Sequence, residues 1–164
     1  MYNVPSVLDD NHKLELLRHS KNFNKKRITQ IDVVPEYNLL IILTGIFILI
    51  FLIKNGIPNL LYLFVDNIVC IHDLNSPNFQ QLYQLQKTRG ATLFALDIKP
   101  NQIVNGENQT VVYLCVAVKR KLQLYNSRGK KFETFNGFEL TVPDIPRELC
   151  WYVFYVRYKI IYVF

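Results

Sequence analysis

The chain has 164 residues, a hydrophobic fraction of 50% and a formal net charge of +6. This length is enough for one ordinary domain, and the high apolar content excludes a chain that is disordered throughout. The three cysteines, Cys70, Cys115 and Cys150, are widely spaced and odd in number. They favour buried thiols in a reduced, cytosolic compartment over a disulfide framework.

Positive charge is concentrated in the second half of the chain, where twelve of the 19 Lys and Arg residues follow residue 86. Half of these twelve surround one predicted hairpin, and such a basic patch suits anionic lipid headgroups, an acidic partner or nucleic acid. No nucleic-acid-binding motif accompanies the charge, so we expect no nucleic-acid partner. A pair of solvated turns is the alternative interpretation. The candidate partner-binding residues are Lys119, Arg120, Lys121, Arg128, Lys130 and Lys131.

The chain begins with a polar segment, residues 1–27, in which Met1–Asn11 lacks the apolar core that a signal peptide needs. Ile28–Val34 then alternates as in a half-buried strand. The turn residues Pro35–Asn38 separate it from a second apolar run, Leu39–Leu43. The two runs predict a β-hairpin.

The tract from Leu39 to Val65 allows two interpretations. Residues 39–53 contain no charged side chain. A membrane-spanning helix needs about 20 apolar residues, however, and Lys54 interrupts the run too early for an easy span. The enrichment in β-branched and aromatic residues, with Asn55-Gly56 as a two-residue turn, favours extended structure instead. A membrane anchor and a lengthened hairpin or disordered insertion both stay open.

Two shorter elements follow this tract. Asn67–Ile71 predicts a strand that ends at His72-Asp73. Phe79–Leu85 is ambiguous, because its apolar residues have helical spacing although a strand is the alternative.

The middle of the chain predicts two antiparallel strands. From Gly90 to Ile98 the residues alternate between two faces, and Val111–Val118 is apolar at every position, as in a strand buried on both faces. Pro100-Asn101 and Asn105-Gly106 have the turn chemistry of a connection between these strands.

The C-terminal part continues the antiparallel pattern. A short strand, Leu122–Tyr125, leads into Asn126–Gly129, which predicts a hairpin turn with Gly129 at positive φ. Lys131–Leu140 alternates loosely and predicts a further strand. The prolines of Val142–Pro146 exclude a central strand, so this segment is predicted to be a connection.

Catalytic and metal-binding patterns are absent from the sequence. No Gly-rich phosphate loop or nucleophile elbow occurs, and the carboxylates are scattered singly. His12, His19 and His72 lie far apart, without ligands at metal-binding spacing. We therefore expect no catalytic residues, no cofactor, no metal and no enzymatic activity.

Several ordered segments resemble one known family. Lys87–Ala95 (Lys-Thr-Arg-Gly-Ala-Thr-Leu-Phe-Ala) and Cys115–Tyr125 (Cys-Val-Ala-Val-Lys-Arg-Lys-Leu-Gln-Leu-Tyr) are similar to the citron homology (CNH) domain, a β-propeller module. The resemblance is strongest to the version in the vacuolar protein sorting subunit of the HOPS endosomal tether. It covers residues 16–43 and 66–151. The further matching segments are Ser20–Lys26, Ile31–Pro35, Asn67–Leu74 and Thr141–Pro146, the last running into Cys150-Trp151.

The resemblance implies a mainly β fold and favours a strand for Phe79–Leu85. Blades take about 40 to 45 residues and a ring needs at least four. We therefore expect a partial β-propeller of two to three antiparallel blades, a fragment whose open edges tend to pair.

The same resemblance implies a non-enzymatic interaction module of a vesicle-tethering subunit, acting in endosome and lysosome or vacuole fusion, protein transport and autophagy. The implied partners are other tethering-complex subunits and a Rab-type small GTPase. The implied location is cytoplasmic and peripheral on late endosomal, lysosomal or vacuolar membranes. Two alternatives stay open, namely a small membrane-anchored protein that uses Leu39 to Val65 and a regulatory citron homology domain of a kinase or Rho exchange factor.

Two tracts depart from the family pattern, residues 45–65 and 152–164, and both are rich in Ile, Phe, Tyr and Leu. AT-rich non-coding DNA gives this composition on translation, so we hypothesise that both are retained intron sequence. The predicted organisation is a polar segment at 1–27, a partial citron homology domain at 28–151 interrupted by the hydrophobic insertion 45–65, and an atypical apolar tail at 152–164.

Overall fold

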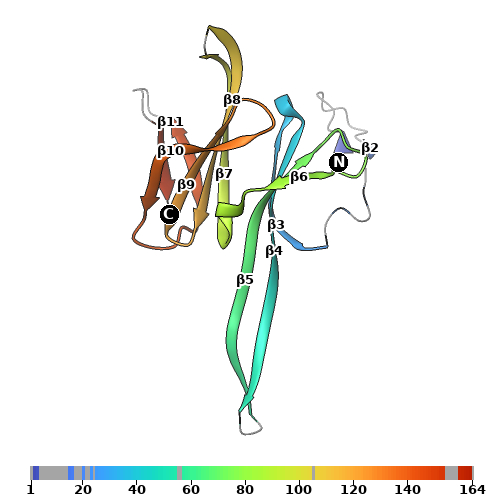
Figure 1. Cartoon of the computed structure of the whole chain (residues 1–164), viewed down its shortest axis with the longest axis vertical. Helices are drawn as coiled ribbons and strands as arrows, with labels where there is room; N and C mark the ends of the chain where they lie inside the picture. Colours follow the sequence, from blue (N-terminus) through green and yellow to red (C-terminus); the bar gives the residue numbers. More distant parts are fainter. Residues whose placement is uncertain are drawn as a thin grey trace, which may run out of the picture.

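Two four-stranded antiparallel sheets form the body of the molecule (Figure 1). The computed structural model describes residues 2–3, 15–16, 20, 23, 25–54, 57–104, 106–153 and 159–163. The sheets have the strand orders β3-β4-β5-β6 and β10-β9-β8-β7, so each strand pairs with its neighbour in the chain. Such four-stranded meanders are the blades of a propeller. The predicted mainly β fold, a partial β-propeller, is confirmed.

The first sheet contains β3 (Arg27–Val34), β4 (Leu39–Lys54), β5 (Ile57–Asp73) and β6 (Gln81–Gln84). A 3-10 turn, η1 (Pro35–Tyr37), joins β3 to β4, and Asn38 closes it at φ 53°. The hairpin predicted for this region is confirmed, as is the strand within Phe79–Leu85.

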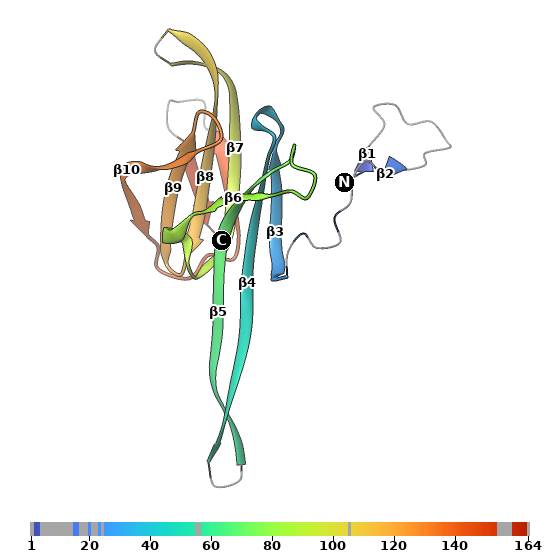
Figure 2. The same cartoon turned by 45° about the vertical axis from the view of Figure 1, so that its right-hand side comes forward.

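The hydrophobic insertion is the far part of the β4–β5 hairpin. Strands β4 and β5 pair along their whole length, from Leu39↔Asp73 to Lys54↔Ile57, and the register shifts once, between Ile50 and Phe51. Beyond Gly45↔Asn67 the two strands leave the sheet and project from the body in both views (Figures 1 and 2). The lengthened-hairpin interpretation therefore describes this tract, although the predicted turn at Asn55-Gly56 lies outside the described residues.

The residues that the structure describes include no helix that is long and apolar enough to cross a membrane.

The second sheet contains β7 (Ala91–Val104), β8 (Glu107–Val118), β9 (Lys121–Ser127) and β10 (Phe132–Thr141). A 3-10 turn, η2 (Gln86–Thr88), connects β6 to this sheet. Strand β8 lies between β7 and β9, and most of its second half is buried. The prediction of a strand covered on both faces is confirmed.

The connection between β7 and β8 and the backbone conformation of Gly129 differ from their predictions. Strand β7 continues through Pro100-Asn101, where the pairing shifts and Asn101 takes φ 54°, so these residues form an irregularity within the strand. Gly129 does not have the positive φ that was predicted for it. The hydroxyl of Ser127 instead braces this turn by donating to the Gly129 carbonyl at 2.6 Å and accepting from its N–H at 3.2 Å.

The main core lies between the two sheets. Apolar side chains of the first sheet meet those of the second, so each blade covers one face of the other. The buried members are Val34, Leu39, Ile41, Leu43, Val69, Ile71, Leu85, Ala91, Phe94, Val112, Leu114, Val116, Tyr125 and Phe132.

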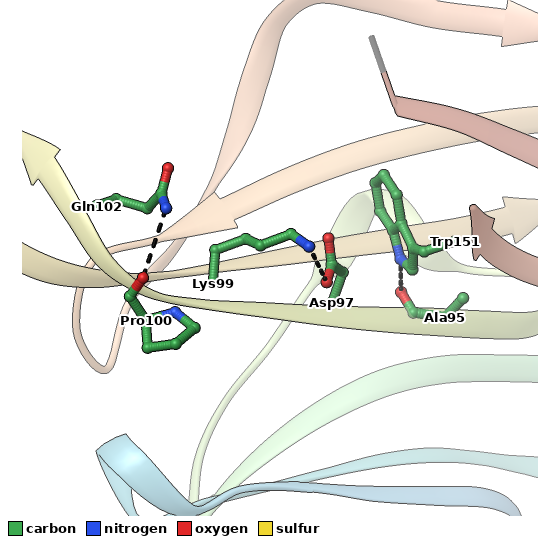
Figure 3. Close-up of polar contacts among 6 residues, drawn as sticks. All are labelled: Ala95, Asp97, Lys99, Pro100, Gln102 and Trp151. Atoms are coloured by element: carbon green, nitrogen blue, oxygen red, sulfur yellow. Dashed lines mark hydrogen bonds and ion pairs between the residues drawn. The ribbon is translucent and has the colours of Figure 1, made fainter. Parts of the chain in front are cut away.

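A third strand pair begins on the outer face of the second sheet. Here β11 (Leu149–Val153) pairs with β12 (Lys159–Val163). Trp151 packs against the apolar cluster on that face and donates a hydrogen bond from Nε1 to the Ala95 carbonyl of β7 at 3.1 Å (Figure 3). Strand β11 is thereby held against the second blade. The remaining described strands are β1 (Tyr2–Asn3) and β2 (Glu15–Leu16).

Candidate partner-binding surface

The structure does not bring the six candidate cations together in one patch. Lys119, Arg120 and Lys121 lie where β8 turns into β9, whereas Arg128, Lys130 and Lys131 lie where β9 turns into β10. The seven residues of β9 separate the two turns, which at about 3.3 Å per residue is roughly 20 Å. The prediction of one patch around one hairpin is therefore wrong, because the basic residues occupy opposite ends of the same strand.

The first cluster, Lys119, Arg120 and Lys121, forms a tight corner. Val118 pairs with Lys121, and the intervening Lys119 takes φ 54°. The Arg120 carbonyl accepts a hydrogen bond from the Val142 N–H at 2.8 Å. All three side chains are exposed, and neither cavity described below includes them.

The second cluster, Arg128, Lys130 and Lys131, lies where the two sheets meet. Tyr83 of β6 donates from its hydroxyl to the Lys130 carbonyl at 2.8 Å and accepts from the Phe132 N–H at 2.8 Å. Burial raises the pKa of the Tyr83 hydroxyl, although the Phe132 N–H opposes this shift. The hydroxyl therefore stays protonated near neutral pH and joins β6 to the start of β10.

An ion pair adds a second link between the sheets. Lys130 Nζ lies 3.3 Å from Asp73 Oδ2, at the end of β5. A hydrogen bond from the Asn75 N–H, together with the contact to Lys130, lowers the pKa of the Asp73 carboxyl. Lys130 thus contacts the first sheet through a partly exposed ion pair, whereas Lys131 meets Glu133 at 3.6 Å with both side chains highly exposed.

A cavity of about 600 Å³ lies between the outer strand of the first sheet and the β9–β10 hairpin, and we call it the β6–β10 groove. Its lining includes half-buried or buried aromatic rings, the exposed Leu82, and cations, but no carboxylate. The lining residues are Leu82, Tyr83, Gln84, Leu85, Gln86, Lys87, Tyr125, Lys130, Lys131, Phe132 and Thr134.

A second, more polar cavity of about 570 Å³ lies beside the same hairpin. It shares Lys130, Lys131 and Thr134 with the β6–β10 groove and adds Arg128 and the exposed Phe135. The second cluster is therefore flanked by two hollows, one mainly apolar and one polar.

The described residues contain no group of three or more His, Cys, Asp or Glu side chains that could hold a metal ion. The cysteines are free, with Cys70 and Cys115 buried. Burial raises the pKa of the Cys115 thiol to about 12, so a reactive thiolate is not available there at neutral pH. The chemistry that this surface offers is recognition through apolar contact and positive charge.

Comparison with known proteins identifies the family. A family model described as CNH domain matches residues 7–162. The chain belongs to the CNH domain family. The resemblance stated from the sequence is therefore confirmed.

Curated relatives of this CNH domain carry related names. The human Vam6/Vps39-like protein is 33% identical over 139 residues, which is 85% of this chain and 12% of the relative. The mouse protein of the same name is 32% identical over the same length. The Vacuolar protein sorting-associated protein 39 homolog of Drosophila melanogaster is 29% identical over 153 residues, or 92% of this chain and 14% of the relative. The CNH domain thus spans about an eighth of the length of these proteins.

Sequence reasoning found the second cluster but missed the groove beside it. Leu82, Tyr83 and Lys87 are more than 40 positions from Lys131 in the chain, and only the packing of the sheets brings them together. Lys87 falls inside a segment that carries the family resemblance, which is the one signal that the sequence offered. No local pattern links that segment to the β9–β10 turn.

Proposed function

We propose that this CNH domain is a non-enzymatic interaction module of a vesicle-tethering subunit that acts in endosome and lysosome or vacuole fusion, protein transport and autophagy. The likeness to the Vam6/Vps39-like proteins over 85% of the chain carries the proposal. Its surface offers a groove and exposed cations, which suit binding to other macromolecules.

The proposed partners are other subunits of the tethering complex and a Rab-type small GTPase. The proposed location is the cytoplasmic surface of late endosomal, lysosomal or vacuolar membranes, with peripheral association. A bulky, charged partner of this kind is recognised through exposed residues and not through buried ones. We assign partner binding to the second cluster, Arg128, Lys130 and Lys131, because the two hollows adjoin it.

Affinity capture tests this function. The purified full chain, immobilised, is exposed to purified tethering-complex subunits and to Rab-type GTPases loaded with a GTP analogue or with GDP. We expect at least one subunit or one GTP-loaded GTPase to be retained specifically. Retention of none of them, by a chain with a cooperative unfolding transition, contradicts the proposed function.

We further propose that residues 45–65 and 152–164 are additions to a partial citron homology domain at 28–151, preceded by the polar segment 1–27. The projection of the far part of the β4–β5 hairpin away from the first sheet supports this organisation, and the core residues that the structure describes between the sheets lie outside both tracts. Sequencing of full-length transcripts tests whether the two tracts are retained introns. Abundant spliced transcripts that keep both tracts contradict that origin.

A further inference from the structure

The charged residues that line the β6–β10 groove all have one sign. Lys87, Lys130 and Lys131 line it, and its other lining residues are apolar or uncharged polar. Lys130 is engaged by Asp73 at 3.3 Å, but Lys87 and Lys131 are exposed. The contact between Lys131 and Glu133 has side chains 81% and 70% exposed, and exposed pairs of this kind hold a charge only weakly. The rim is therefore open to an acidic ligand.

The two highly exposed lining cations come from segments far apart in the chain. Lys87 lies in η2, which follows β6, whereas Lys131 lies in the turn before β10. The same cavity is lined by apolar side chains, with Phe132 buried and Leu82 41% exposed. A leucine that is exposed within a concave surface, and not on a convex one, is suited to receive an apolar side chain.

The backbone of β10 offers a third means of recognition. Strand β10 is the last strand of its sheet among the described residues. Its Phe132 N–H points away from β9, since it donates to the Tyr83 hydroxyl. Alternation along a strand places the backbone N–H and C=O of Thr134 on the same outer edge, and Thr134 is exposed and lines the groove. An extended peptide can add to such an edge.

We propose that the β6–β10 groove binds a short extended segment of a protein partner that carries acidic side chains and at least one large apolar side chain. The acidic groups meet Lys87 and Lys131, the apolar side chain packs on Leu82, and the peptide backbone pairs with β10 at Thr134. This assignment rests on the proposed function as an interaction module and adds the chemistry that the module recognises.

Fluorescence anisotropy with the purified full chain tests the assignment. The probe is a fluorescein-labelled peptide that alternates Glu with Leu, and its control is the same peptide with Lys in place of Glu. We expect saturable binding of the acidic peptide alone. The double variant Lys87→Glu/Lys131→Glu is expected to weaken binding about tenfold or more at physiological salt, as reversal of two contacting charges does.

The matched control is Lys119→Glu/Arg120→Glu, which makes the same charge change at the other end of β9. This control is expected to change the affinity by less than about twofold, because its charges lie beyond the screening distance at physiological salt. Leu82→Ala is expected to weaken binding several-fold even at high salt, where charge contacts are screened. Equal loss of affinity in both double variants overturns the assignment.

Other occupants give different results. If the peptide does not bind but vesicles containing phosphatidylserine do, and Lys87→Glu/Lys131→Glu removes vesicle binding, the groove is a lipid site and the assignment is wrong. If the chain self-associates in sedimentation and Leu82→Ala abolishes this, a second copy fills the groove and the assignment is again wrong. Capture of tethering subunits that persists in the groove variants overturns this assignment alone and leaves the proposed function standing.

Discussion

The side-chain amide of Gln30 forms a two-way hydrogen bond with the backbone of Phe94. Gln30 Nε2 donates to the Phe94 carbonyl at 2.6 Å, and the Phe94 N–H donates to Gln30 Oε1 at 2.9 Å. Gln30 lies on β3 of the first sheet and Phe94 on β7 of the second. The Gln30 amide therefore bonds the outer backbone edge of β7 in the way that a neighbouring strand would. One side chain thus satisfies both polar groups of a residue in the core between the sheets.

Replacing Gln30 by Leu is expected to lower the free energy of unfolding by about 1 to 3 kcal/mol, because the N–H and carbonyl of Phe94 lose their partners next to the core. Urea unfolding followed by circular dichroism measures the change. The matched control is Gln102→Leu, since the amide of Gln102 reaches only the Pro100 carbonyl of its own strand at 3.4 Å and is exposed (Figure 3). Equal destabilisation by both substitutions contradicts the assigned role of Gln30.

Gly45→Ala is expected to destabilise the protein by about 1 to 3 kcal/mol through overpacking. A Cβ on Gly45 would lie 1.8 Å from Asn67 Oδ1 and 2.8 Å from Asn67 Cα. The Asn67 side chain cannot simply swing away, because its Nδ2 donates to the Ala91 carbonyl, and the Asn67 carbonyl accepts from the Gly90 N–H. Thermal unfolding measures the effect.

The control for this substitution is Gly129→Ala, where an added Cβ meets no atom within 4 Å and φ is not positive. It is expected to leave the melting temperature unchanged or slightly higher, as Gly→Ala at an unstrained position does. A Gly45→Ala protein with the melting temperature of the parent would contradict this prediction, because it would mean that Gly45 and Asn67 can move apart without cost.

Acidification is expected to destabilise the protein through His72. Burial lowers the pKa of this imidazole, although the hydrogen bond between its Nδ1 and the Phe79 carbonyl opposes the shift. Below the unfolded-state pKa of about 6.5 the His72 imidazole is protonated in the unfolded chain, whereas in the folded chain it stays neutral to a lower pH. Stability is therefore lost as the pH falls through about 6.5, and the loss levels off once the pH passes the lower folded-state pKa.

Urea midpoints measured between pH 7.5 and pH 5 for the parent and for His72→Asn isolate this contribution. The parent is expected to lose more stability on acidification than the variant does. Parallel pH profiles would assign the acid sensitivity to other groups.

Removing the far part of the β4–β5 hairpin is expected to leave the fold intact. A variant that replaces residues 46–66 by an Asn-Gly turn joins Gly45 to Asn67, which already face each other across the two strands. The core residues of both strands whose burial the structure describes lie outside this segment. We expect an unfolding free energy within about 1 kcal/mol of the parent, since large losses of stability come from changes in the core or in buried networks, and higher solubility by centrifugation. Loss of the cooperative transition would show that the hairpin is part of the domain.

The strands could be predicted from the sequence because each one depends on a local pattern. The alternation from Gly90 to Ile98 and the continuous apolar run Val111–Val118 report directly which faces of a strand are covered. Turn details were less accessible. The conformation of Gly129 depends on the Ser127 hydroxyl, and the irregularity at Pro100-Asn101 depends on pairing with β8.

The candidate surface was only partly predictable for a different reason. Six cations within thirteen positions suggested one patch, but the extended strand β9 separates the two clusters by its full length. The β6–β10 groove arises where segments distant in the chain meet, through the contacts of Tyr83 with Lys130 and Phe132. Such a juxtaposition is a property of how the blades pack, which no local pattern encodes.

Binding of a captured tethering subunit or Rab-type GTPase to two charge-reversal variants tests the central claim most directly. Isothermal titration compares Arg128→Glu/Lys131→Glu in the second cluster with Lys119→Glu/Arg120→Glu in the first. We predict that the second-cluster variant binds about tenfold more weakly or worse, whereas the first-cluster variant stays within about twofold of the parent. Equal affinities for all three proteins, or a loss confined to the first-cluster variant, would contradict a partner-binding surface at the β9–β10 turn.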